Sequence, residues 1–159
     1  MIAHDLYAET NPAWVGYVLA AFLRGFVEAD SAGAELPMAY LGVPICLSGD
    51  LAATFDGSNK KTGLREWLER SPQLQLELAD RLNGSMGLVT NAVRLACFSR
   101  IVRLEDGRLL PGSATLKADL AKGLSLELSG PVKRADRLGF WLGACGSTKT
   151  AFDILGLSL

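Results

Sequence analysis

The feature that most constrains the fold is an apolar helix pattern that begins at Asn11-Pro12. An asparagine side chain can cap the free amides of a first helical turn, and the backbone of proline is already suited to that turn. The apolar or small residues that follow at helical spacing are Trp14, Val18, Ala21, Phe22 and Gly25. A single apolar stripe of this kind predicts a helix that packs in the core of a mainly helical domain.

Similar start signals predict more helices in the middle of the chain. The three predicted helices are Thr62 with Leu64, Trp67 and Leu68; Ser71-Pro72 with Leu74, Leu78 and Leu82, ending at Asn83-Gly84; and Ser85 with Met86, Val89, Val93 and Cys97. Before them, Leu36 to Leu47 is apolar on every side and carries two prolines. That segment is either a buried irregular stretch or a short helix.

A β-hairpin is predicted after the third of these helices. Residues 101–104 and 108–110 flank a Glu105-Asp106-Gly107 turn, in which Asp-Gly supplies the positive φ angles of a tight turn. Three short helices followed by a hairpin is the order of a winged helix. We therefore expect a winged-helix-like core over residues 62–112.

Two further helices are expected at the end of the chain, as a pair over residues 129–157. Ser129-Gly130-Pro131 reads as the start of the first, and Gly146-Ser147 ends it and caps the second, which runs through Leu155. Small residues beside Trp141 predict close packing of the first helix; they are Gly139, Gly143 and Ala144. A helix around 114–122 and a stretch of open type at 124–128 precede the pair. With no repeat and no linker, residues 1–159 are expected to form a single domain.

Composition narrows the class of protein. A chain of 159 residues with 49% hydrophobic and 21% charged residues can bury a core, which excludes a disordered protein. Its formal net charge of −1 gives no global positive field for binding nucleic acid. The cysteines, Cys46, Cys97 and Cys145, are too far apart for a disulfide framework or a zinc site. No metal and no cofactor are expected.

The sequence also favours a cytoplasmic protein without membrane contact. The first residues lack the basic start and apolar run of a secretory signal. The most apolar stretch, Trp14 to Val27, contains Arg24 and is too short to span a bilayer.

Residues for catalysis are scarce. The single histidine, His4, leaves none for a Ser/His/Asp or Cys/His arrangement in the rest of the chain. Residues 143–150 come close to a phosphate-binding loop, but Thr148 stands where the glycine should be and a helix pattern precedes the run. A helix break capped by Ser147 explains these residues better. We therefore predict that the chain is not an enzyme.

Four arginines gather on the third predicted helix and the hairpin: Arg94, Arg100, Arg103 and Arg108. In a winged helix these positions would face a DNA groove and backbone, so a DNA-binding protein is the main alternative. Glu105 and Asp106 at the hairpin tip oppose it, because a DNA-binding wing is usually basic. A solvated face or an acidic protein partner fits these charges better.

The order of these segments resembles the middle component of three-component ABC systems, a family that includes the small subunit of Lamassu-type defence systems. The resemblance rests on segments along nearly the whole chain: Asn11-Pro12-Ala13, Leu36-Pro37 to Leu47, Thr62 to Leu68, Asp106-Gly107-Arg108-Leu109, Gly139-Phe140-Trp141-Leu142-Gly143, and Ser147 to Leu155-Gly156-Leu157. Around Leu47-Ser48-Gly49-Asp50 the chain departs from its relatives, which are longer there or carry a histidine.

The resemblance implies an adaptor in a bacterial anti-phage or anti-plasmid complex. Its partners would be an SMC-like ABC ATPase and a nuclease-like effector, and DNA would be met through the assembled complex. An adaptor needs exposed apolar patches. The candidates are Trp14 and Tyr17 on the first helix and Phe140, Trp141 and Phe152 on the last two. For each of these aromatic residues the alternative is a place in the core of the domain.

Overall fold

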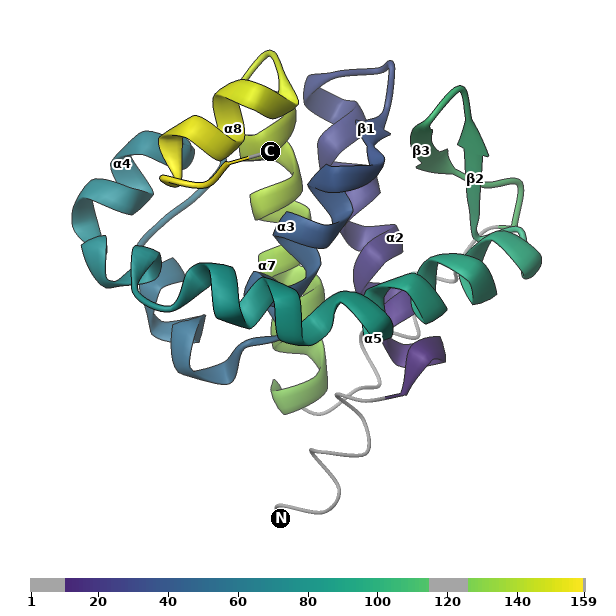
Figure 1. Cartoon of the computed structure of the whole chain (residues 1–159), viewed down its shortest axis with the longest axis horizontal. Coiled ribbons are helices and arrows are strands. Elements are labelled where there is room, and N and C mark those ends of the chain that lie inside the picture. The colour runs from purple at the N-terminus through teal and green to yellow at the C-terminus, as the bar shows by residue number, and fades with distance from the viewer. Residues whose placement is uncertain (1–10, 115–125, 159) are drawn as a thin grey trace.

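Two helices, α2 (Pro12–Ala29) and α7 (Leu126–Gly143), lie side by side at the centre of the molecule (Figure 1). The computed structural model describes residues 11–114 and 126–158. The other elements, in chain order, are β1 (Ala34–Glu35), α3 (Leu36–Leu47), the 3-10 helix η1 (Gly49–Phe55), α4 (Gly63–Arg70), the 3-10 helix η2 (Pro72–Gln75), α5 (Leu78–Phe98), β2 (Val102–Glu105), β3 (Arg108–Pro111) and α8 (Thr148–Ile154). The expectation of a mainly helical fold is confirmed.

The start of α2 is as predicted. Asn11 Oδ1 accepts a hydrogen bond of 2.9 Å from the amide of Ala13, and Pro12 occupies the first helical position. The predicted apolar stripe is buried except at its first residue; its buried members are Val18, Ala21, Phe22 and Gly25. The N-terminal cap and the buried stripe of this helix therefore both form where the sequence predicts them.

Replacing Asn11 with alanine should lower the free energy of unfolding by about 1 kcal/mol, because the helix loses its side-chain cap. Urea unfolding followed by tryptophan fluorescence measures this change. Asn11→Asp keeps an oxygen acceptor and should retain most of the stability. Equal midpoints for the wild type and Asn11→Ala would contradict the cap.

Glycines bring α2 and α7 into backbone contact. A Cβ atom on Gly25 would lie 1.9 Å from the carbonyl oxygen of Asp136, and one on Gly139 would lie 2.0 Å from that of Phe22. On Gly143 it would lie 2.6 Å from the carbonyl oxygen of Phe26. The predicted close packing is confirmed at Gly139 and Gly143, which face α2.

The predicted break at Asn83-Gly84 is wrong, because α5 runs without interruption from Leu78 to Phe98. The hydroxyl of Ser85 donates to the carbonyl oxygen of Arg81 at 2.8 Å and caps no new helix. Packing of α5 across α2 and α3 outweighs the helix-breaking tendency of an Asn-Gly pair, which is about 1 kcal/mol for the glycine.

The start predicted at Ser71-Pro72 is also wrong for an α-helix, since this proline opens only the short helix η2. The longer helix α5 begins after Glu77, which has a positive φ of 57°. Two α-helices, α4 and α5, therefore stand where three were expected before the hairpin. The winged-helix-like arrangement is not confirmed.

The hairpin is confirmed, with β2 and β3 paired antiparallel and Leu104 opposite Leu109. Its turn residues Asp106 and Gly107 both have positive φ, 52° and 77°. The short strand β1 was not predicted; it pairs with β3, so the sheet order is β1-β3-β2.

At the end of the chain the structure confirms one predicted helix start and corrects another. Ser147 caps α8, accepting a hydrogen bond of 3.1 Å from the amide of Thr150. The start predicted at Ser129-Gly130-Pro131 is wrong, because α7 begins at Leu126 and contains Pro131.

The segment Leu36 to Leu47, for which the sequence left a helix or an irregular stretch open, is helix α3. The helix expected at 114–122 lies almost wholly outside the described residues.

Candidate functional site

The four predicted arginines lie at one end of the molecule, where the end of α5 meets the hairpin (Figure 1). Arg103 pairs with Glu105 at 2.8 Å. Arg108 Nη1 donates to the carbonyl oxygen of Gly33 at 3.0 Å. Arg94 and Arg100 are exposed, and neither has an ion-pair partner in the described part of the chain. Of these four arginines, Arg94 and Arg100 are therefore the two whose charge is available to a partner.

The predicted interface aromatics occupy different environments. Trp14 and Tyr17 are half-buried at the start of α2, with ring centroids 6.4 Å apart. Phe140 is half-buried below Lys60, whose Nζ lies 5.4 Å from the ring centroid. Trp141 is only 1% exposed, which makes it a core residue of this chain. Phe152 is half-buried on α8 and lines a surface groove.

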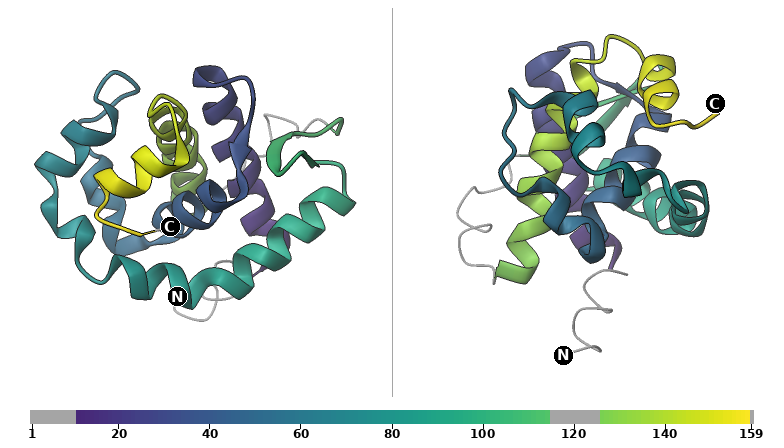
Figure 2. Two further views of the ribbon diagram at one scale, coloured as in Figure 1. Left: turned by 45° about the horizontal axis from the view of Figure 1, so that its top comes forward. Right: turned by 90° about the vertical axis from the view of Figure 1, so that its left-hand side faces the viewer.

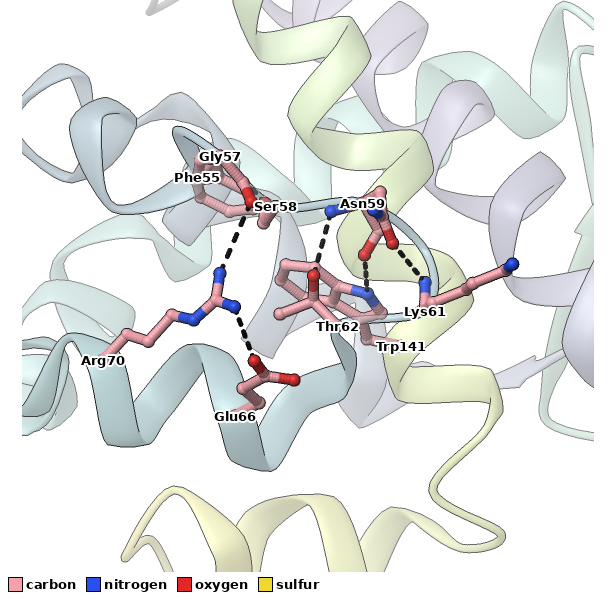
Figure 3. Close-up of polar contacts among 9 residues, drawn as sticks. All are labelled: Phe55, Gly57, Ser58, Asn59, Lys61, Thr62, Glu66, Arg70 and Trp141. Carbon is pink, nitrogen blue, oxygen red and sulfur yellow. Dashed lines mark hydrogen bonds and ion pairs between the residues drawn. The ribbon is translucent and has the colours of Figure 1, made fainter.

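Trp141 anchors the loop before α4. Its indole Nε1 donates to the carbonyl oxygen of Asn59 at 3.1 Å (Figure 3). Its ring stacks on Phe55 and tilts against Trp67, with centroids 5.9 and 5.4 Å away. Thr62 does not cap α4 as predicted; its hydroxyl accepts a hydrogen bond from the amide of Asn59 instead, which tightens this loop.

Two arginines of α7 hold backbone carbonyls of other elements. Arg134 donates twice to the carbonyl oxygen of Cys46, at 3.1 and 2.7 Å, and Arg137 donates to that of Phe55 at 3.1 Å. Burial lowers the pKa of Arg134, and burial raises the pKa of the Cys46 thiol. The thiol therefore stays protonated, which makes it a poor nucleophile. These contacts serve the fold.

An apolar groove lies between α3, α5 and the end of the described chain. It has a volume of about 690 Å³ and is lined mainly by carbon. Its walls are Leu36, Pro37, Tyr40 and Leu41 from α3; Ala79, Leu82, Asn83 and Met86 from α5; and Phe152, Gly156, Leu157 and Ser158 from the C-terminal segment. We call it the apolar groove.

The walls of the apolar groove combine a side chain held by a hydrogen bond with a flexible, exposed one. The hydroxyl of Tyr40 is hydrogen-bonded to that of Thr90, which ties α3 to α5. Met86 is 52% exposed, so its flexible thioether side chain is available to a partner. A groove of this size with apolar walls suits the apolar face of a helix better than a charged ligand.

The described residues offer little for catalysis. Within residues 11–114 and 126–158, no group of three His, Cys, Asp or Glu side chains could hold a metal ion. His4 lies outside this part of the chain. Lys149 of the phosphate-loop-like segment pairs with Asp153 at 2.7 Å, and Ser147 is the α8 cap. Asp50 binds Arg81 through both oxygens, at 2.9 and 2.8 Å, and this hydrogen bonding lowers the pKa of its carboxyl group.

No single helix of the described residues is long and apolar enough to cross a membrane. Within the same part of the chain, α3 and η1 taken together reach the required length and composition, but they are bent by 93°.

Comparison with known proteins supplies a family. The family model for the ABC-three component (ABC-3C) system Middle Component 3 matches residues 1–159. Neither the curated proteins nor the solved structures contain a match. The match spans the entire chain and agrees with the resemblance seen in its motifs, so this chain belongs to the ABC-3C system Middle Component 3 family.

Proposed function

We propose that the chain is a non-catalytic adaptor that binds another protein component of its ABC-3C system through the apolar groove. Membership of a middle-component family supports association with other components. The observation that carries the proposal is the groove itself, about 690 Å³ with mainly apolar walls from three segments. Met86 and Phe152 are its partly exposed anchors. Side chains of this kind contribute most when a partner shields them from water.

The proposal extends to the identity and place of the partners. We assign the groove to a helix of an SMC-like ABC ATPase and leave the rest of the surface for an effector subunit, in a cytoplasmic Lamassu-type defence complex. ATP hydrolysis and nucleic-acid cleavage would then belong to those partners. The resemblance of the sequence motifs supports this assignment.

The DNA-binding alternative has less support from the structure. Arg103 is paired with Glu105, Arg108 is bound to Gly33, and the predicted recognition helix is part of the longer α5. Two exposed arginines, Arg94 and Arg100, can still add to a DNA path formed mainly by partner subunits.

Met86→Asp should weaken binding to the ATPase component at least tenfold, because it places a charge in an apolar contact. The measurement is co-purification of the two co-expressed chains, followed by titration of the purified partners. Leu104→Asp is a matched control, since Leu104 is 51% exposed on the hairpin, away from the groove.

Two results would count against the groove. Wild-type chain that does not co-purify with the ATPase at low salt would oppose the adaptor function itself. If Met86→Asp bound as tightly as the wild type and Leu104→Asp lost binding, the partner would bind at the hairpin end and not in the groove.

A further inference from the structure

The outward face of α5 has no covering element among the described residues. A stripe of exposed residues runs along the helix at spacings of 3 or 4: Asp80, Asn83, Gly87, Asn91, Arg94 and Phe98. The buried residues Val89, Val93 and Ala96 lie on the opposite face. In Figure 2, α5 runs along the outer edge of the molecule, and the residues of this stripe are exposed from Asp80 to Phe98. A helix of 21 residues is about 31 Å long.

Exposed apolar side chains stand at or near both ends of α5. Phe98 at the last position of α5 is 87% exposed, and Leu76, two residues before its start, is 70% exposed. Leu95 is exposed beside Phe98 on the same helix. An isolated exposed leucine is ordinary, but a nearly fully exposed phenylalanine at the end of a free helix face is typical of a protein contact.

Opposite charges lie at the two ends of α5. Glu77 and Asp80 lie at its N-terminal end, and Arg94 and Arg100 lie at its C-terminal end. None of these four has an ion-pair partner among the described residues. A partner must therefore present basic residues at one end and acidic residues at the other. A second copy of α5, turned antiparallel, has this distribution.

We propose that the chain forms a two-fold symmetric dimer through α5, with the axis at Gly87. Positions equally far from Gly87 then lie opposite each other across the interface. Asp80 and Arg94 are each seven residues from Gly87, so two Asp80–Arg94 pairs form. In the same register Asn83 faces Asn91, and Phe98 lies at the start of the partner's α5, which Leu76 precedes by two residues. The charged and polar positions of the stripe match simultaneously in this register, as a self-complementary two-fold interface requires.

The glycines near the axis favour a close approach of the two helices. A Cβ atom added to Gly84 or Gly87 would meet nothing within 4 Å, so packing inside the chain does not require either glycine. Each costs an exposed helix about 1 kcal/mol relative to alanine. At a helix crossing the same glycines remove the side chains that would keep the two backbones apart.

The dimer leaves the apolar groove open. Most groove residues of α5, such as Leu82 and Met86, lie on a flank of the helix, and only Asn83 belongs to both surfaces. A dimer would present two grooves and could hold two partner chains. Self-association is measured on the purified chain alone, so its failure would leave the adaptor function untouched.

Charge reversal tests the register. Asp80→Arg and Arg94→Asp should each weaken the dimer by roughly tenfold or more, because each variant creates two like-charge contacts in its own dimer. An equimolar mixture of the two variants should recover the wild-type affinity, since both contacts become attractive in the mixed dimer. Glu69→Arg changes the same charge on α4 and should have no effect. Sedimentation equilibrium gives the dissociation constants, and circular dichroism checks the folding of each variant.

Cross-linking provides a second measurement that does not depend on charge. Gly87→Cys places two thiols at the axis, where mild oxidation should join the chains, whereas the wild-type cysteines, Cys46, Cys97 and Cys145, are partly or fully buried. A wild-type chain that stays monomeric at 0.1 mM would overturn the proposal. So would a dimer that resists both charge reversals, or a mixture of the two variants that stays dissociated.

Discussion

Gly25→Ala is expected to lower the free energy of unfolding by about 3 kcal/mol or more, although it adds a single methyl group. The new Cβ atom would lie 1.9 Å from the carbonyl oxygen of Asp136, and two further backbone atoms of that residue lie within 3.1 Å. Because the obstacle is backbone and not a side-chain tip, relief requires α2 and α7 to separate. These helices form the centre of the core, so their separation weakens packing throughout the domain.

Gly16→Ala on the same helix is the matched control. Its Cβ atom would lie 3.8 Å from Cβ of Ala96, an ordinary van der Waals contact. The alanine should therefore leave the stability unchanged or raise it by up to about 1 kcal/mol through helix propensity. Urea unfolding of both variants, followed by tryptophan fluorescence, separates the two effects. Similar midpoints for Gly25→Ala and Gly16→Ala would contradict the close contact of α2 with α7.

Local signals predicted the elements whose ends depend on nearby residues. The cap at Asn11, the Asp106-Gly107 turn and the cap at Ser147 each satisfy their own backbone groups within a few positions. Such features do not depend on the rest of the fold, so sequence alone defines them.

Signals that compete with packing were misleading. Asn83-Gly84 has the composition of a helix end, yet α5 continues through it because residues on both sides are buried against α2 and α3. Pro131 stands inside α7 for a related reason, since its ring is buried in the core face of that helix. The sequence shows the local cost of such a residue but not the burial that offsets it.

The candidate site could be predicted only in part. Phe152 was named as an interface residue and does line the apolar groove. Tyr40 and Met86 were missed because the walls of the groove come from segments far apart in the chain, which only the fold brings together. The exposed stripe on α5 was hidden by the predicted helix break, which divided one face between two helices.

Trp141→Ala is expected to cost about 3 to 5 kcal/mol of stability, the usual range for removing a buried tryptophan. The substitution empties the space beside Phe55 and Trp67 and leaves the carbonyl oxygen of Asn59 without its indole donor. Trp141→Phe keeps an aromatic ring but not the N–H group, so its loss should be smaller. The midpoints of urea unfolding for the two variants measure the difference.

The same pair of variants decides whether Trp141 serves the core or a partner. An interface tryptophan would lower partner affinity when replaced, while leaving the isolated chain stable. A core tryptophan does the reverse, because the fraction of Trp141→Phe that remains folded still presents an intact groove. With this residue 1% exposed, we expect Trp141→Phe to bind the proposed partner as tightly as the wild type once its folded fraction is taken into account. Unchanged stability together with weaker binding would contradict the assignment of Trp141 to the core.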